Sequence, residues 1–275
     1  MSNCKVIALT NQKGGVGKTT TAVNLGVSLV QQGKKVLLID ADAQANLTMA
    51  LGYNRPDDIP ITLSNVMQNI IDDKTFDVSQ GIIHHSEGVD LLPSNIELSG
   101  FEVRLINAMS RERVLKTYVN EVKKNYDYVL IDCMPSLGMI TINALAAADS
   151  VIIPTQPYYL SAKGLELLLR SVSMVKRQIN PKLRIDGILM TMVMPRTNIS
   201  KEITATVKSA YGQKIKVFDT EIPHSIRAVE ATAEGKSIFA YDKSGKVAAA
   251  YEQLGKEVAE IGEKQRNQNR ADRIR

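Results

Sequence analysis

Short apolar runs alternate with longer stretches of helical periodicity along most of this chain. The apolar runs predict strands at Val6–Leu9, Val36–Ile39, Val89–Leu92, Tyr128–Ile131, Val151–Ile153, Ile185–Met190 and Lys216–Phe218. The periodic stretches predict helices at Lys18–Gln32, Glu97–Asn107, Arg111–Lys124, Met139–Ala147, Ala162–Gln178, Lys201–Tyr211 and Lys246–Ile261. This alternation is typical of strand–helix–strand units. We therefore expect an α/β fold, with a mostly parallel twisted sheet flanked by helices on both faces.

The chain is expected to form one domain. Its 275 residues contain no linker, low-complexity tract or internal repeat, and α/β sheets of this size commonly fold as a single unit. Residues 1–262 are predicted to form this domain, and residues 263–275 a polar, basic C-terminal tail. Tyr53–Ile61, which contains two prolines and two aspartates, predicts a surface loop.

A glycine-rich segment, Asn11–Thr21 (N-Q-K-G-G-V-G-K-T-T-T), lies between the first predicted strand and the first predicted helix. Glycines let successive N–H groups point at phosphate oxygens, and the helix N-terminus adds the positive end of its dipole. In such a loop Lys18 reaches the β- and γ-phosphates and the Thr19 hydroxyl sits on Mg²⁺. Gln12 replaces the first glycine of the general pattern, and a second lysine follows it. The residues expected to bind a nucleoside triphosphate are Lys13, Gly14, Gly15, Val16, Gly17, Lys18, Thr19 and Thr20.

Three aspartates stand at the ends of apolar runs. Asp40 and Asp42 close the second predicted strand, and Asp132 follows Tyr128–Ile131 as a Walker B carboxylate does. Carboxyl ends of parallel strands face the crevice where α/β sheets bind ligands. Mg²⁺ keeps most of its waters in proteins, so one hydroxyl and one or two carboxylates suffice to hold it. The metal ligands predicted here are Thr19, Asp40 and Asp132, with the carboxylates acting through water.

The residues that follow Asp132 predict a conformational switch. Pro135 and Gly138 fit a mobile segment, Met134–Gly138, close to the γ-phosphate. Cys133 is predicted to be a small buried residue and not a nucleophile.

Composition limits the environment of the chain. The net charge of +5 permits contact with nucleic acid without requiring it. Cys4 and Cys133 are too few for a disulfide framework or a zinc site, so a reducing cytoplasm is expected. No apolar run approaches the ~20 residues of a membrane span, and no membrane partner is expected.

The loop K-G-G-V-G-K-T resembles the deviant Walker A motif of the ParA/Soj/MinD ATPases. The resemblance extends to Leu37–Gln44, Tyr128–Gly138 and Glu221–Ile238, in the family's order, and is closest to the short Soj-like partition ATPases. It implies a P-loop NTPase of the deviant Walker A (SIMIBI) type. It also implies a Mg²⁺-dependent ATPase that hydrolyses ATP to ADP and phosphate, slowly without its partner.

The resemblance also implies roles for single residues. In the family, the lysine at the position of Lys13 crosses a two-fold interface to the partner subunit's phosphates, so that ATP holds a sandwich dimer together. Because Lys18 already neutralises charge at the β- and γ-phosphates, a second lysine in the same loop would add little stabilisation unless it contacted another nucleotide. Asp42 corresponds to the residue that positions or polarises the attacking water. Lys13, Lys18 and Asp42 are thus the implied catalytic set, and Met192 and Pro223 the implied neighbours of the adenine.

The Soj-like members carry DNA-contacting arginines at positions that match Arg196 and Arg227, and Lys236 lies nearby in sequence. Phosphate contacts of this kind are independent of sequence and sensitive to salt. The function implied is an ATP-dependent DNA partition ATPase. Its ATP-bound dimer binds nonspecific DNA and is reset by a ParB-like centromere-binding protein. Its implied location is the cytoplasm, associated with the nucleoid.

Three other functions within the superfamily fit the sequence less well. A MinD-like division-site ATPase, the main alternative, needs an amphipathic membrane-targeting tail, and Glu263–Arg275 is almost without apolar residues. A metallocluster protein needs paired ligating cysteines, which Cys4 and Cys133 do not provide. A tyrosine autokinase needs a terminal tyrosine cluster, which is absent from the sequence.

Overall fold

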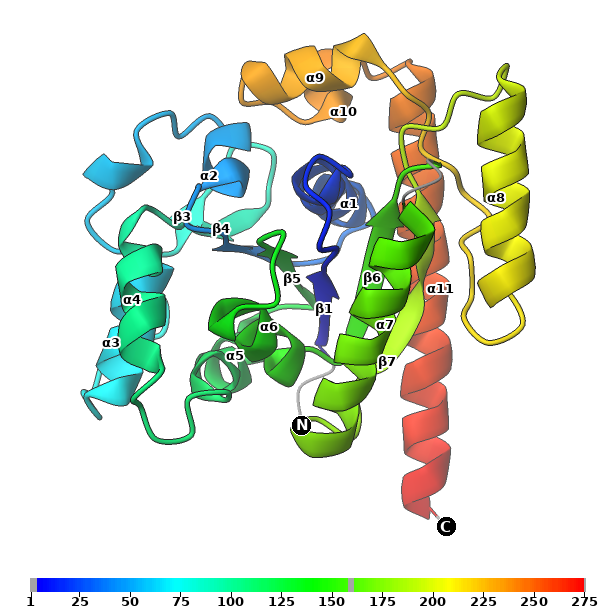
Figure 1. The fold of residues 1–275 in the computed structure, drawn as a ribbon. Coiled ribbons are helices and arrows are strands. Elements are labelled where there is room, and N and C mark those ends of the chain that lie inside the picture. The colour runs from blue at the N-terminus through cyan, green and yellow to red at the C-terminus, as the bar shows by residue number, and fades with distance from the viewer. Residues whose placement is uncertain (1–3, 158–160, 275) are drawn as a thin grey trace.

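The computed structural model describes residues 4–157 and 161–274. A seven-stranded sheet with the order β3-β4-β2-β5-β1-β6-β7 forms its centre (Figure 1). All neighbouring strands are parallel except β3 and β4, which pair antiparallel at one edge. The predicted mostly parallel α/β sheet is confirmed. The strands are β1 (Lys5–Leu9), β2 (Val36–Ala41), β3 (Ile83–His84), β4 (Asp90–Leu92), β5 (Tyr128–Cys133), β6 (Ser150–Thr155) and β7 (Arg184–Met190).

Helices cover both faces of the sheet because successive side chains of a strand point to opposite faces. In β1, Val6 and Ala8 belong to one apolar cluster, whereas Ile7 and Leu9 belong to the other. The first cluster includes side chains of α3 (Leu63–Ile71), α4 (Glu97–Leu105), α5 (Val114–Val122), α6 (Met139–Ala147), α7 (Ser161–Gln178) and α8 (Asn198–Tyr211). The second includes side chains of α1 (Lys18–Gln31), α2 (Asn46–Ala50), α9 (Ile226–Ala233), α10 (Ile238–Tyr241) and α11 (Lys246–Ile274).

The strand predicted at Lys216–Phe218 is wrong. Val217 makes only an isolated parallel bridge to Ile188 of β7. The chain then turns away, because the backbone N–H groups of Asp219 and Thr220 donate to the carboxylate of Glu257 on α11 instead of to a neighbouring strand.

The sequence also left several elements unpredicted. These are β3, α2, α3, α9 and α10. Of these, α2 and α10 have five and four residues, too few for helical periodicity to be recognised. The last helix, α11, continues to Ile274, beyond its predicted end at Ile261, and in Figure 1 it extends past the lower end of the sheet. None of the helices in the described ranges is long and apolar enough to cross a membrane.

Candidate nucleotide-binding site

The glycine-rich loop joins the carboxyl end of β1 to the amino end of α1. Gly15 and Gly17 adopt φ angles of 70° and 80°, in the left-handed region that favours glycine. Helix α1 begins at Lys18, directly after Gly17. The loop therefore turns sharply into a helix N-terminus, as a phosphate-binding loop requires.

Polar residues after neighbouring strands hold this loop in place. Gln156 follows β6 and donates from Nε2 to the Gly15 carbonyl at 2.7 Å. Thr191 follows β7 and donates from its hydroxyl to the Val16 carbonyl at 2.8 Å. Asn11 accepts the Lys13 backbone N–H at 3.0 Å and donates to the Pro154 carbonyl at 2.7 Å.

Sequence reasoning missed all three of these supporting side chains. The signal for two of them was a polar residue directly after a buried strand, because such residues lie at the edge where the loop sits. The bonds to the Gly15 and Val16 carbonyls fix the course of the loop.

Lys18 and Thr19 lie against the end of β5. The Thr19 hydroxyl donates to Asp132 Oδ2 at 2.6 Å, and Lys18 Nζ donates to the Lys13 carbonyl at 3.4 Å. Burial lowers the pKa of the Lys18 ammonium, and the nearby carboxylate of Asp132 opposes that shift. Burial, followed by the charge of Asp40, raises the pKa of Asp132 to about 8. The site therefore brings a buried ammonium group close to buried carboxyl groups, and the charge of each group shifts the pKa of its neighbours.

Asp40 and Asp42 occupy different environments at the end of β2. Asp40 is paired in register with Asp132 of β5, and burial raises its pKa to about 7. Its Oδ2 accepts both the backbone N–H and the hydroxyl of Thr48, at 2.8 and 2.7 Å. Asp42 Oδ1 accepts the Gln44 N–H at 3.0 Å, and the Asp42 N–H donates to Asp40. Asp40 thus anchors α2, while Asp42 lies in the turn that leads to it.

The oxygen donors around Thr19 fit a magnesium ion. Asp132 Oδ1 is buried and has no hydrogen-bond partner among the described residues. A buried polar atom normally has a hydrogen-bond partner or contacts a bound water or ion. A hydroxyl and carboxylates are hard ligands of the type Mg²⁺ prefers. A divalent cation beside them would also favour their ionised forms. Thr19 and Asp132 would hold the ion. A metal role for Asp40 stays a prediction, because its Oδ2 accepts both Thr48 donors and its Oδ1 accepts the Asp42 N–H.

Because the two carboxylates have different partners, substitutions of Asp132 and Asp40 should have different effects. Asp132→Asn should weaken ATP binding about tenfold in Mg²⁺ and little in EDTA, because it removes charge next to the ion. Asp40→Asn should instead lower the free energy of unfolding by about 1–3 kcal/mol, because an amide N–H would replace an acceptor of the Thr48 donors. Nucleotide titration and thermal denaturation check the two results. A similar loss of Mg²⁺-dependent binding in both variants would show that both carboxylates serve the metal.

Helix α6, which follows the segment after Asp132, is bonded to α4 and to the loop before α5. Glu102 Oε1 accepts the Ile140 N–H at the start of this helix, at 3.2 Å, where a negative charge complements the helix dipole. A side chain at Gly138 would meet this carboxylate. One turn further on, the Asn143 side chain donates to the carbonyls of Met139 and Arg111, at 2.9 and 2.7 Å.

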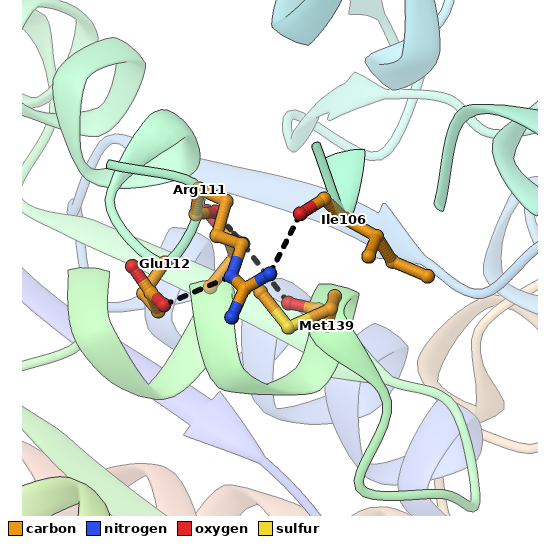
Figure 2. A network of polar contacts seen from close by, with 5 residues as sticks. Ile106, Arg111, Glu112 and Met139 are labelled. Atoms are coloured by element: carbon orange, nitrogen blue, oxygen red, sulfur yellow. Dashed lines mark hydrogen bonds and ion pairs between the residues drawn. The ribbon is translucent and has the colours of Figure 1, made fainter. Parts of the chain in front are cut away.

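Arg111 extends this attachment to the end of α4 (Figure 2). Its guanidinium donates to the Ile106 carbonyl at 2.6 Å and to Glu112 at 3.2 Å. The loop between α4 and α5 is therefore fixed to α6. The switch segment Met134–Gly138 stays a prediction, now bounded by the fixed ends of β5 and α6.

The two predicted neighbours of the adenine lie on adjacent segments. Met192 follows β7, has a φ angle of 52°, and its Cε would be 3.7 Å from a Cβ placed on Gly17. Pro223 forms a parallel bridge with Val193. Both residues therefore lie near the carboxyl end of β7, close to the glycine-rich loop. Their contact with a base stays a prediction.

The three predicted DNA contacts are exposed and lie on two segments. Arg196 is in the loop before α8 and Arg227 is in the first turn of α9. The backbone at Val193 bonds to Ile222 and His224, at 2.9 Å each, which places the two segments side by side. Arg227 pairs with Asp242 at 3.2 Å, and Lys236 pairs with Glu234 at 2.8 Å. These pairs reduce the positive charge that the surface offers, and DNA contact by all three residues stays a prediction.

The sheet, the glycine-rich loop and the carboxylates at its edge define a P-loop nucleoside triphosphatase. The AAA domain family matches residues 4–185. Over 259 residues the chain is 44% identical to the sporulation initiation inhibitor protein Soj of Bacillus subtilis (strain 168), covering 94% of this chain and 99% of that protein. It is 39% identical to the chromosome partitioning protein ParA of Myxococcus xanthus (strain DK1622), over 92% of this chain and 87% of that protein. The chain belongs to the ParA/Soj family of P-loop ATPases.

A solved structure agrees with this assignment. Cobyrinic acid a,c-diamide synthase from Mycobacterium smegmatis, with bound ATP analogue and magnesium, has a TM-score of 0.80 and 35% identity. The match covers 92% of this chain and 93% of that protein. The septum site-determining protein MinD from Pyrococcus horikoshii OT3, complexed with Mg-ADP, has a TM-score of 0.71 and 26% identity over 94% of this chain and 97% of that protein. The fold of this chain is therefore that of the ParA/MinD-like ATPases.

Proposed function

We propose that this chain is an ATP-dependent DNA partition switch. It binds ATP and Mg²⁺, pairs through the nucleotide into a sandwich dimer, and binds DNA without sequence preference. Hydrolysis to ADP and phosphate, stimulated by a ParB-like partner, resets it. In the cell it is cytoplasmic and associated with the nucleoid.

The observation that carries this proposal is the loop that contains both Lys13 and Lys18. Lys18 is buried against Asp132, so it serves the nucleotide of its own subunit. Lys13 is half-buried and its neighbour Gly14 is exposed, and in a sandwich dimer a second subunit's nucleotide would approach this part of the loop. Charge supplied in trans is the role that an arginine finger has in other P-loop enzymes. The name of the ParA relatives, chromosome partitioning protein, supports partition as the process served.

Sedimentation with DNA in three nucleotide states tests the proposal. The chain should bind unrelated DNA sequences about equally with a non-hydrolysable ATP analogue, and much more weakly with ADP or no nucleotide. One subunit offers few basic contacts, and pairing doubles them on one assembly. Equal DNA binding in all three states would contradict the switch.

Arg227→Ala should weaken nonspecific DNA binding and leave ATP-dependent pairing intact. Each lost phosphate contact removes a salt dependence of about 0.9 in log K against log salt, so a dimer that loses two contacts should show a slope shallower by about 1.8. Fluorescence anisotropy at several salt concentrations measures both quantities, and Arg196→Ala should behave alike.

Arg170→Ala is the matched control. Arg170 is also an exposed arginine with an acidic partner, Glu166, but it lies on α7. If Arg227→Ala and Arg196→Ala both bind DNA as Arg170→Ala does, the DNA surface is elsewhere.

A further inference from the structure

Residues 226–241, here called the α9–α10 unit, pack on the ATPase core through Ala231, Ile238 and Phe239 and are joined to it by a few hydrogen bonds. The Ser237 N–H donates to Glu87 at 2.9 Å, and the Ser237 hydroxyl donates to the same carboxylate. The Ile238 N–H donates to Asn24 Oδ1 of α1 at 2.7 Å. Figure 1 shows the unit (orange) above α1 and separate from the sheet. Its position therefore depends on α1, on α2 and on Glu87, which lies in the turn before β4.

Helix α2 in turn depends on the nucleotide site. It begins four residues after Asp42, and the Asp42 carbonyl accepts the Ala45 N–H at 2.9 Å. Two hydrogen bonds from Thr48 fix its middle turn to Asp40. A change in the turn at Asp42, such as one caused by a nucleotide and its metal, must therefore move α2 or strain these bonds.

The end of α2 meets the α9–α10 unit backbone to backbone. Gly52 and Gly235 both have left-handed φ angles, +87° and +67°. A Cβ on Gly235 would lie 2.3 Å from Gly52 Cα and 2.6 Å from Gly52 N, far inside van der Waals contact. No side chain lies between the two backbones to absorb a displacement, and close-packed groups transmit strain.

We propose that the Gly52–Gly235 contact transmits the state of the nucleotide site, through α2, to the α9–α10 unit and its Arg227. One consequence of the coupling, that presentation of the DNA surface depends on the nucleotide, rests on the proposed function. The mechanical coupling itself involves only this chain. The physical basis for such coupling is an element with two arrangements whose equilibrium is biased by both sites.

Hydrogen exchange with and without a non-hydrolysable ATP analogue and Mg²⁺ tests the coupling independently of DNA. In the wild type, exchange in residues 226–241 should change at least twofold on nucleotide binding. In Gly235→Ala the glycine-rich loop should still become protected, nucleotide affinity should stay within about twofold, and the response of residues 226–241 should disappear. DNA affinity of the nucleotide-bound variant should fall at least fivefold.

Gly33→Ala is the matched control, because Gly33 has a similar φ of +76° and a Cβ on it would meet no atoms within 4 Å. It carries the same backbone strain without the contact and should respond as the wild type does. Gly52→Ala is a gentler second variant, since its Cβ would lie 3.5 Å from the Gly235 carbonyl oxygen, and it should reduce the response.

Two results would overturn the coupling: no nucleotide response of residues 226–241 in the wild type, or an unchanged response in Gly235→Ala. A response in the wild type that Gly235→Ala abolishes, in a protein that binds no DNA in any nucleotide state, would support the coupling and refute the proposed function.

Discussion

Lys18→Ala should reduce ATP affinity on the order of 100-fold. The ammonium is buried at the foot of the loop, and hydrogen bonds to charged groups contribute about 1.5–3 kcal/mol each. Loss of two such bonds to phosphate oxygens corresponds to at least about 3 kcal/mol, or slightly more than two factors of ten. Binding of a fluorescent ATP analogue measures the change.

Lys35→Ala is the control for this variant, because Lys35 is an exposed lysine that precedes β2. It should bind ATP as the wild type does. The Lys18 variant should remain folded, because the substitution removes an ammonium group that is costly to bury. The lowering of its pKa by burial reflects that cost. Near-normal ATP affinity in folded Lys18→Ala would exclude the assigned phosphate contact.

Asp42→Ala should bind ATP normally and lose hydrolysis, which separates water positioning from phosphate binding. The carboxylate also accepts the Gln44 N–H, so the alanine variant removes a charge and a turn contact together. Asp42→Asn keeps an acceptor oxygen and removes only the charge. Phosphate release should therefore be lost in both variants. Normal turnover in Asp42→Asn would assign the residue to the turn and not to the reaction.

The sequence predicts the parts of this site that depend on local pattern. Alternating apolar runs place the parallel strands, and glycines between a strand and a helix place the loop, because both signals lie within about a dozen residues. The aspartates at strand ends could be assigned to one edge for the same reason. Asp40 and Asp132 do stand in register on adjacent strands.

Contacts between distant segments could not be predicted in this way. Gln156 and Thr191 reach the loop from 141 and 175 residues away, and their local signal, a polar residue directly after a buried strand, does not say which loop they contact. The strand expected at Lys216–Phe218 failed because Glu257, on a distant helix, takes the N–H groups that follow it. The contact between Gly52 and Gly235 is of the same kind: each glycine has a turn conformation locally, and only the fold brings the two together.

Gly14→Val should abolish ATP-dependent pairing and preserve ATP binding by the single subunit. Gly14 is exposed, its φ lies outside the left-handed region, and a Cβ on it would meet no atoms within 4 Å. The subunit itself therefore has open space for a Cβ at this position. A sandwich dimer brings two such loops together through the nucleotides, and branched side chains at that point would hold them apart.

Light scattering with ATP, in the Asp42→Ala background that should prevent hydrolysis, measures pairing. The Asp42→Ala parent should have the mass of a dimer, and the double variant with Gly14→Val the mass of a monomer. Gly100→Val is the matched control, because Gly100 is also exposed and a Cβ on it would meet no atoms within 4 Å, but it lies on α4. It should pair as the parent does. A dimer in the Gly14 variant would place the interface away from the loop, and Lys13 would then have no second nucleotide to contact.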